Sequence, residues 1–179
     1  WNAGTHVLTF LKANPAVTPD WDAAQRTVRY LNSSPDPDET PRTVIYVAAD
    51  QDGPSQTATT ALSVTSVDDA PIITLNAAAL AVNEGTGAIV DSGATVADED
   101  TATWGGGSLT ASVVGATALD YLRVAPGGDI TVESDVSIRH GITEVATYTG
   151  FGTAQIVITF LPEATTEIVQ AIVRQIEYL

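Results

Sequence analysis

Alternation of apolar and polar residues runs along most of the chain and predicts β-strands. The segment 42–50, RTVIYVAAD, alternates around Val44 and Tyr46, as a strand with one buried face does. A turn with a Gly-Pro breaker follows, and QTATTALSVTSV at 56–67 is expected to return as the second strand of a hairpin. Further short strands follow after residue 71: IITL, GAIVDSGATVAD, SLTASVVG, DYLRVA, GDITVES, EVATYTGF and QIVITF. The pattern predicts an all-β fold of the β-sandwich type.

Two segments carry the 3.6-residue spacing of a helix. In 166–179, TEIVQAIVRQIEYL, the apolar residues fall on one face, and Thr166 or Thr165 can cap the start. In 18–31, TPDWDAAQRTVRYL, Thr18 is the expected cap and a proline follows at the first helical position. The residues expected to face the sheet from this second helix are Trp21, Val28 and Leu31. We therefore expect one short helix in each half of the chain.

An internal repeat divides the chain. The segment 8–31 matches 158–179 in the order of its apolar positions, and Thr-Phe-Leu recurs at an offset of 150 residues. After a two-residue gap the offset becomes 148, with the pairs Ala23 and Ala171, Arg26 and Arg174, Tyr30 and Tyr178, Leu31 and Leu179. The repeat predicts that residues 1–67 close one module, that 68–71 form an acidic linker, and that 72–179 open the next module.

Charge narrows the range of partners. The chain has 22 acidic and 7 basic residues, a formal net charge of -15. This excess argues against nucleic acid and anionic membrane surfaces as partners, and it suits hard cations, which take oxygen ligands. No apolar run approaches the ~20 residues that a membrane-spanning helix needs. The absence of cysteine excludes disulfides, zinc thiolates and cysteine nucleophiles.

Carboxylates gather where predicted strands end. Asp68 and Asp69 lie side by side in VDDAP, at the seam between two predicted strands. Asp98 and Asp100, in VADED, are two residues apart, so an extended backbone points both to one side and Glu99 to the other. Adjacent carboxylates repel each other, and a shared cation removes that repulsion. Because Ca²⁺ takes six to eight oxygen ligands, the sequence favours a calcium site at these strand ends.

The acidic segments also resemble a known family. VNEGTGAIVDSGATVADED, at 82–100, resembles the early half of a cadherin-type repeat, with a glutamate in the first strand and then A-x-D-x-D. The segment 46–71 resembles the closing half, with a glycine-proline turn, a long last strand and an acidic linker before proline. The remainder is similar to the longer cadherin-like repeats of large calcium-dependent bacterial surface and secreted proteins of the RTX-adhesin type. The resemblance implies tandem Greek-key β-sandwich modules, cadherin- or immunoglobulin-like, in an extracellular protein.

In that family, calcium binds between successive modules. The residues that match its ligand positions are Asp68, Asp69, Asp98, Asp100, Glu84 and Asp50. The resemblance implies that the first four share the joint within this chain, that the glutamate serves the next joint, and that Asp50 serves the preceding one. The linker departs from the family pattern, because Asp68 stands where asparagine is usual and Thr65-Ser66 replaces an acidic position. This departure favours one bound ion over three.

These features predict a non-catalytic calcium-binding structural and adhesion module, in which calcium makes the joint between repeats rigid. Catalysis is not expected, because His6 and His140 lack metal-ligand spacing, and TWGGGSL lacks the lysine and Ser/Thr of a phosphate loop. The alternative is a carbohydrate- or ligand-binding accessory domain of a secreted enzyme. Trp1 and Trp104 are its candidate stacking residues.

Neighbouring repeats of the same polypeptide are the predicted partners. Two half-modules would leave open sheet edges, so 1–67 of one chain is expected to complete 72–179 of another, head to tail. The alternative is that 72–179 is a complete domain by itself. A cell-surface glycan or protein is a further candidate partner. No nucleic acid partner and no membrane insertion are expected.

Overall fold

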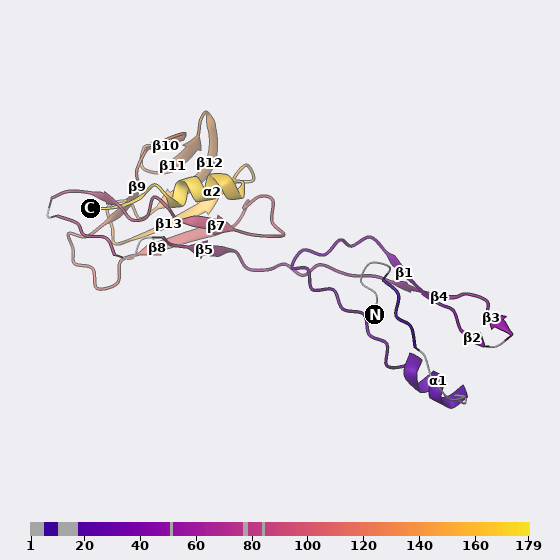
Figure 1. The fold of residues 1–179 in the computed structure, drawn as a ribbon. Helices are drawn as coiled ribbons and strands as arrows, with labels where there is room; N and C mark the ends of the chain where they lie inside the picture. The colour runs from indigo at the N-terminus through magenta and orange to yellow at the C-terminus, as the bar shows by residue number, and fades with distance from the viewer. Residues whose placement is uncertain (1–5, 11–17, 51, 77–78, 84) are drawn as a thin grey trace. The chain divides into compact units, whose positions relative to one another are not determined.

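The computed structural model describes residues 6–10, 18–50, 52–76, 79–83 and 85–179, with the backbone alone at 18–21 and at 50. This part of the chain consists mainly of β-strands in several antiparallel sheets, with two short helices (Figure 1). The all-β prediction is therefore confirmed. The chain divides into two compact units, Trp1–Ser34 and Pro35–Leu179. In the described part, neither helix is long and apolar enough to span a membrane.

The first unit contains helix α1, Thr18–Gln25, which begins at the predicted residue. The helix ends earlier than predicted, because the N–H groups of Thr27 and Val28 bond to carbonyls three residues back and tighten the chain into a turn. Val28 is half-buried, but Leu31 is 85% exposed. The predicted packing of Leu31 against a sheet is therefore wrong, and the side chain of Trp21 lies outside the described part.

The predicted hairpin is present at the start of the second unit. Strand β1, Arg42–Tyr46, pairs antiparallel with β4, Ala58–Leu62, and Val44 lies opposite Thr60. Two short strands, β2 (Ala49–Asp50) and β3 (Gly53–Pro54), pair near its tip. Exposure alternates along β1, as the alternating sequence predicts.

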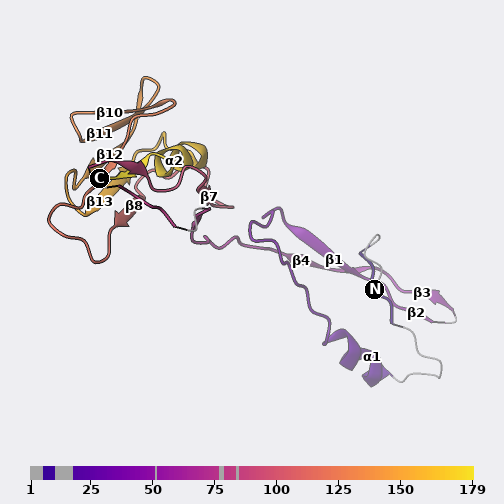
Figure 2. The same ribbon diagram turned by 60° about the vertical axis from the view of Figure 1, so that its left-hand side comes forward.

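Residues 72–179 carry three further sheets. The largest has five strands, in the order β10 (Ile130–Glu133), β11 (Ser137–His140), β12 (Thr143–Thr149), β13 (Gln155–Phe160) and β8 (Ser108–Ser112). The second has three strands, in the order β6 (Ala88–Ile89), β14 (Ile176–Tyr178) and β9 (Leu122–Val124). The third pairs β5 (Ile72–Thr74) with β7 (Thr95–Ala97). Figure 2 shows β10 and β8 at opposite sides of the largest sheet, and the described strands of these three sheets all pair antiparallel.

The core lies between these sheets and helix α2, Thr166–Val173, which lies beside β7 (Figure 1). Alternate residues of β13, from Ile156 to Phe160, are fully buried, and so are Val169 and Ile172 of the helix. Trp104 packs edge-on against Phe160, with ring centroids 5.7 Å apart and planes at 80°. The apolar spacing in the sequence thus matches the buried faces of both elements.

Helix α2 ends six residues before the predicted end at 179. Thr165 is its N-cap and accepts a hydrogen bond from the N–H of Ile168 at 3.4 Å. The helix stops at Val173, and Ile176–Tyr178 forms strand β14 between β6 and β9. Helical spacing continues through this stretch of the sequence, but pairing on both sides of β14 satisfies its backbone groups and overrides the local pattern.

The sequence pattern predicts no strand between GDITVES and EVATYTGF, but Ser137–His140 forms strand β11. The preceding turn contains Ser134 and Asp135, whose φ angles are 52° and 56°. Left-handed turns of this kind usually contain glycine or asparagine, so the sequence carries no strong signal for the turn here. The position of the hairpin therefore depends on strand pairing rather than on turn residues.

Candidate metal site at the acidic linker

Pairing of β5 with β7 determines where the acidic linker lies. Ile72, the first residue of β5, is opposite Ala97, the last residue of β7. Linker residues 68–71 come directly before β5, and Asp98 follows directly after β7. Because the two strands are antiparallel, the linker and the D-x-D segment lie at the same end of this sheet.

One hydrogen bond joins the two segments. The backbone N–H of Asp69 donates to Oδ2 of Asp100 at 2.7 Å, across 31 positions of sequence. Oδ1 of Asp100 is buried and has no hydrogen-bond partner among the described residues. Oδ1 of Asp98 accepts the N–H of Thr101 at 3.1 Å, which closes a turn around the D-x-D segment. The sequence-predicted residues Asp69 and Asp100 are therefore in contact.

This contact keeps the carboxylate of Asp100 ionised. The N–H of Asp69 is the main reason that the pKa of Asp100 lies below its ordinary value, and partial burial opposes the shift. The backbone N–H of Asp100 itself and Thr101 lower that pKa further. A metal ligand must be deprotonated, so the arrangement presents an oxygen in the form that a cation needs.

The other predicted ligands differ in exposure, and some lie outside the described residues. The side chains of Asp68 and Asp69 are exposed, and that of Asp98 is half-buried. Glu84 lies outside the described residues, and so does the side chain of Asp50, whose backbone pairs with Gly53. Within the described ranges, no three His, Asp or Glu side chains converge closely enough to hold a metal ion. The shared site for four aspartates is therefore a prediction, and the Asp69–Asp100 contact is its observed part.

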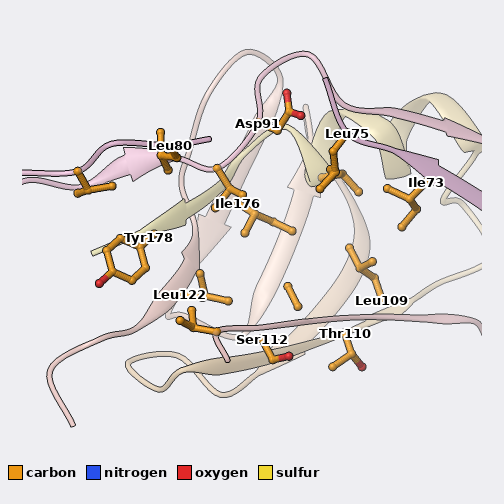
Figure 3. A pocket seen from close by; sticks show the side chains of 15 residues that line it. Ile73, Leu75, Leu80, Asp91, Leu109, Thr110, Ser112, Leu122, Ile176 and Tyr178 are labelled. Carbon is orange, nitrogen blue, oxygen red and sulfur yellow. The ribbon is translucent and has the colours of Figure 1, made fainter. Parts of the chain in front are cut away.

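A second feature is an open apolar groove of about 650 Å³ (Figure 3). Its walls come from β5, β8, β9, β14 and the segment before β6, and all of its lining residues lie between Ile73 and Tyr178. Leu75, Leu80 and Leu109 project from three of these segments. Alternation in SLTASVVG predicts strand β8, but it carries no sign that β8 lies at the edge of a sheet. The groove therefore could not be predicted from the sequence pattern.

Asp91 lines the upper rim of the groove and is 7% exposed. Its two carboxylate oxygens accept the N–H of Asn76 at 2.5 Å and that of Gly93 at 2.8 Å. The bond from Gly93 closes a turn between β6 and β7, and the bond from Asn76 joins this turn to the segment after β5. The alternating sequence instead predicts one continuous strand over 87–98. The buried acid is thus accounted for by local backbone structure.

The structure shows that the aromatic residue Trp104 is buried. Its side chain is 8% exposed, and its Nε1–H donates to Oγ1 of Thr166 at 3.1 Å. The predicted stacking role of Trp104 in a carbohydrate site is therefore wrong, because its ring faces the core and not the solvent. Trp1 lies outside the described residues.

Comparisons with known proteins give no match for the chain among protein-family models, curated proteins or solved structures. The cadherin-like resemblance accordingly remains a prediction from the motifs of residues 46–100.

Proposed function

We propose that the chain is a non-catalytic, calcium-binding structural module of a tandem-repeat adhesion protein that acts outside the cell. In this proposal the modules are cadherin-like Greek-key β-sandwiches, and calcium binds at the 68–71 joint. Asp69 and Asp100 are ligands, with Asp68 and Asp98 beside them. The observation that carries the proposal is the hydrogen bond from the N–H of Asp69 to Asp100, because it brings the linker to the D-x-D segment.

The chemistry of Asp100 supports a cation rather than a solvated turn. One of its carboxylate oxygens accepts a hydrogen bond, and the other is buried with no partner among the described residues. Leaving a charged oxygen buried without a partner is unfavourable, and a bound cation would satisfy it. Asp98 lies two residues before Asp100, and the linker with Asp68 and Asp69 lies at the same end of the β5–β7 sheet. A divalent cation would offset the repulsion between these negative charges.

Calcium fits this site better than other metals. Its ligands are oxygens, its coordination is flexible, and extracellular calcium modules bind with dissociation constants of about 10⁻⁴–10⁻³ M. Without cysteine, the chain offers no thiolate for zinc or copper. In a longer array of repeats, Glu84 would serve the next joint and Asp50 the preceding one.

The mechanism follows from the position of the joint. Without calcium, the aspartates of the linker and the D-x-D segment repel each other, and the linker turns freely about the start of β5. With calcium, shared ligation fixes the linker against the end of β7. The module before the linker then keeps one orientation relative to the module after it, and an array of modules becomes stiff.

Spin-label distance measurements test this mechanism, because the chain has no native cysteine. Labels at Thr59→Cys in β4 and Thr159→Cys in β13 occupy exposed positions on either side of the joint. We expect a broad distance distribution in EDTA and a narrow one in millimolar calcium. Asp100→Asn should keep the distribution broad in both, and the exposed control Asp129→Asn should behave like the parent chain. The same distribution with and without calcium would contradict the proposal.

A further inference from the structure

The groove lies beside an unpaired strand edge. Strand β8 pairs with β13 on one side and is the terminal strand of its sheet among the described strands. Leu109 and Ala111 of β8, and Val113 directly after it, are half-buried and line the groove. A free edge next to an apolar surface is the geometry in which a sheet accepts an added strand.

Apolar side chains on the opposite wall are also exposed. Ile73 is 41% exposed, Leu75 is 59% exposed and Leu80 is 43% exposed, and all three line the groove. Exposed apolar side chains grouped on one concave surface mark an interaction site more often than scattered ones do. A ligand that fits both features would supply a strand and an apolar face.

The β1–β4 hairpin has matching features. It forms a two-stranded sheet of its own, and hairpins of this kind are marginally stable unless they pack against another sheet. Val44, Tyr46 and Leu62 lie on one face, because Leu62 is opposite Arg42, two residues from Val44 along the strand. These three side chains are only half-buried. The hairpin thus carries an apolar face and strand edges that can pair.

The internal repeat relates the position of the hairpin in the sequence to that of the groove. Tyr30-Leu31 corresponds to Tyr178-Leu179, where strand β14 ends. This strand is the central one of the three-stranded sheet, and it lines the groove. The sequence that follows Tyr30-Leu31 contains the hairpin at 42–62. In repeat register, a hairpin of this kind therefore comes directly after the segment that forms the groove.

We propose that the groove of one chain binds the β1–β4 hairpin of a second copy. The hairpin adds to the free edge of β8 and turns the face with Val44, Tyr46 and Leu62 into the groove. Each chain then offers one hairpin and one groove, so the contact is head to tail and extends into chains of molecules. The calcium ligands proposed at the joint, Asp68, Asp69, Asp98 and Asp100, do not line the groove. This proposal therefore stands or falls separately from the calcium site.

The net negative charge of the chain predicts how association of two copies depends on salt. Each copy carries a formal net charge of -15, so two copies repel at low ionic strength. Salt screens this repulsion. It leaves the free energy gained by burying apolar surface unchanged or makes it more favourable. We therefore expect association to increase with salt, which is opposite to the behaviour of a complex held by ion pairs.

Sedimentation velocity in EDTA and moderate salt tests the proposal directly. The parent chain should show a weight-average sedimentation coefficient that rises from micromolar to near-millimolar concentration. Ser112→Arg, at an exposed groove position, and Val44→Asp, on the docking face, should each remain monomeric. Ile45→Asp, on the opposite face of β1, is the matched control and should associate like the parent chain. Thermal unfolding of each variant separates lost association from lost folding.

Mixing the two defective variants gives the decisive result. Ser112→Arg keeps an intact hairpin, and Val44→Asp keeps an intact groove, so an equimolar mixture should form a one-to-one dimer that grows no further. Calcium should not be required. A parent chain that stays monomeric at every concentration would overturn the proposal, and so would a mixture that stays monomeric or an equal effect of Val44→Asp and Ile45→Asp.

Discussion

The hydroxyl of Tyr178 donates a hydrogen bond to Oδ1 of Asp120, and Thr117 donates to Oδ2 through its N–H at 2.6 Å and its hydroxyl at 2.8 Å. The bond from Tyr178 is the main reason that the pKa of Asp120 lies below its ordinary value. The same bond, together with burial, raises the pKa of Tyr178. These residues connect β14 to the loop before β9, so their ionisation affects the sheet that walls the groove.

These two shifts predict how stability depends on pH. The lowered pKa of Asp120 contributes stability that is complete above about pH 4, the unfolded value, and is lost as pH falls through the folded pKa. The raised pKa of Tyr178 contributes stability that is complete below about pH 10 and is lost as pH rises through the folded pKa. We therefore expect the urea midpoint of Tyr178→Phe to fall less than that of the parent chain, both at low pH and at high pH.

The control for this prediction is Tyr121→Phe, at a tyrosine whose hydroxyl has no hydrogen-bond partner among the described residues. This variant should keep the pH profile of the parent chain. Identical profiles for Tyr178→Phe and the parent chain would show that the bond to Asp120 contributes nothing to stability in solution.

At the scale of single elements, burial should decide the effect of a substitution. Ile172 of α2 is fully buried, and Ile142 in the turn between β11 and β12 is 93% exposed. We expect Ile172→Ala to lower the free energy of unfolding by about 2–5 kcal/mol, because it leaves a cavity against the sheet. Ile142→Ala should change it by less than about 0.5 kcal/mol. Equilibrium urea unfolding measures both, and comparable losses would mean that α2 does not pack against the core.

The turn between β12 and β13 gives a second pair of variants. Gly150 and Gly152 both have positive φ angles, 87° and 73°. A Cβ at Gly150 would lie 2.1 Å from the carbonyl oxygen of Gln155, whereas a Cβ at Gly152 meets nothing within 4 Å. Gly152→Ala should cost about 1–2 kcal/mol from the backbone alone. Gly150→Ala should cost clearly more in the same unfolding assay, and equal losses would argue against this turn geometry.

Sequence patterns predict elements better than they predict how elements pair. Alternation locates the hairpin and most strands, because a half-buried strand needs it. It misses β14, since the apolar residues there also fit a helix, and it misses β11, since the turn before it contains Ser134 and Asp135 rather than glycine. The same limit applies to the candidate site. Acidic pairs are visible in the sequence, but the contact of Asp69 with Asp100 depends on the pairing of β5 with β7.

At the scale of the whole molecule, calcium should act on the joint and on stability together. A ligand that binds only the folded chain raises its stability with the logarithm of one plus the ratio of ligand concentration to dissociation constant. We therefore expect millimolar calcium to raise the thermal midpoint of the parent chain, and magnesium to raise it less because Mg²⁺ dehydrates reluctantly and demands stricter geometry. Equal shifts with sodium chloride of matched ionic strength would indicate charge screening instead of a site.

Calcium binding at the linker is the central claim, and isothermal titration calorimetry of the EDTA-treated 179-residue chain tests it most directly. We expect saturable binding with a dissociation constant of about 10⁻⁴–10⁻³ M. The double variant Asp98→Asn/Asp100→Asn should lose this binding, and Asp129→Asn should retain it. No saturable heat in several millimolar calcium, with an unchanged thermal midpoint, would contradict the account, and so would equal binding by the parent chain and the double variant.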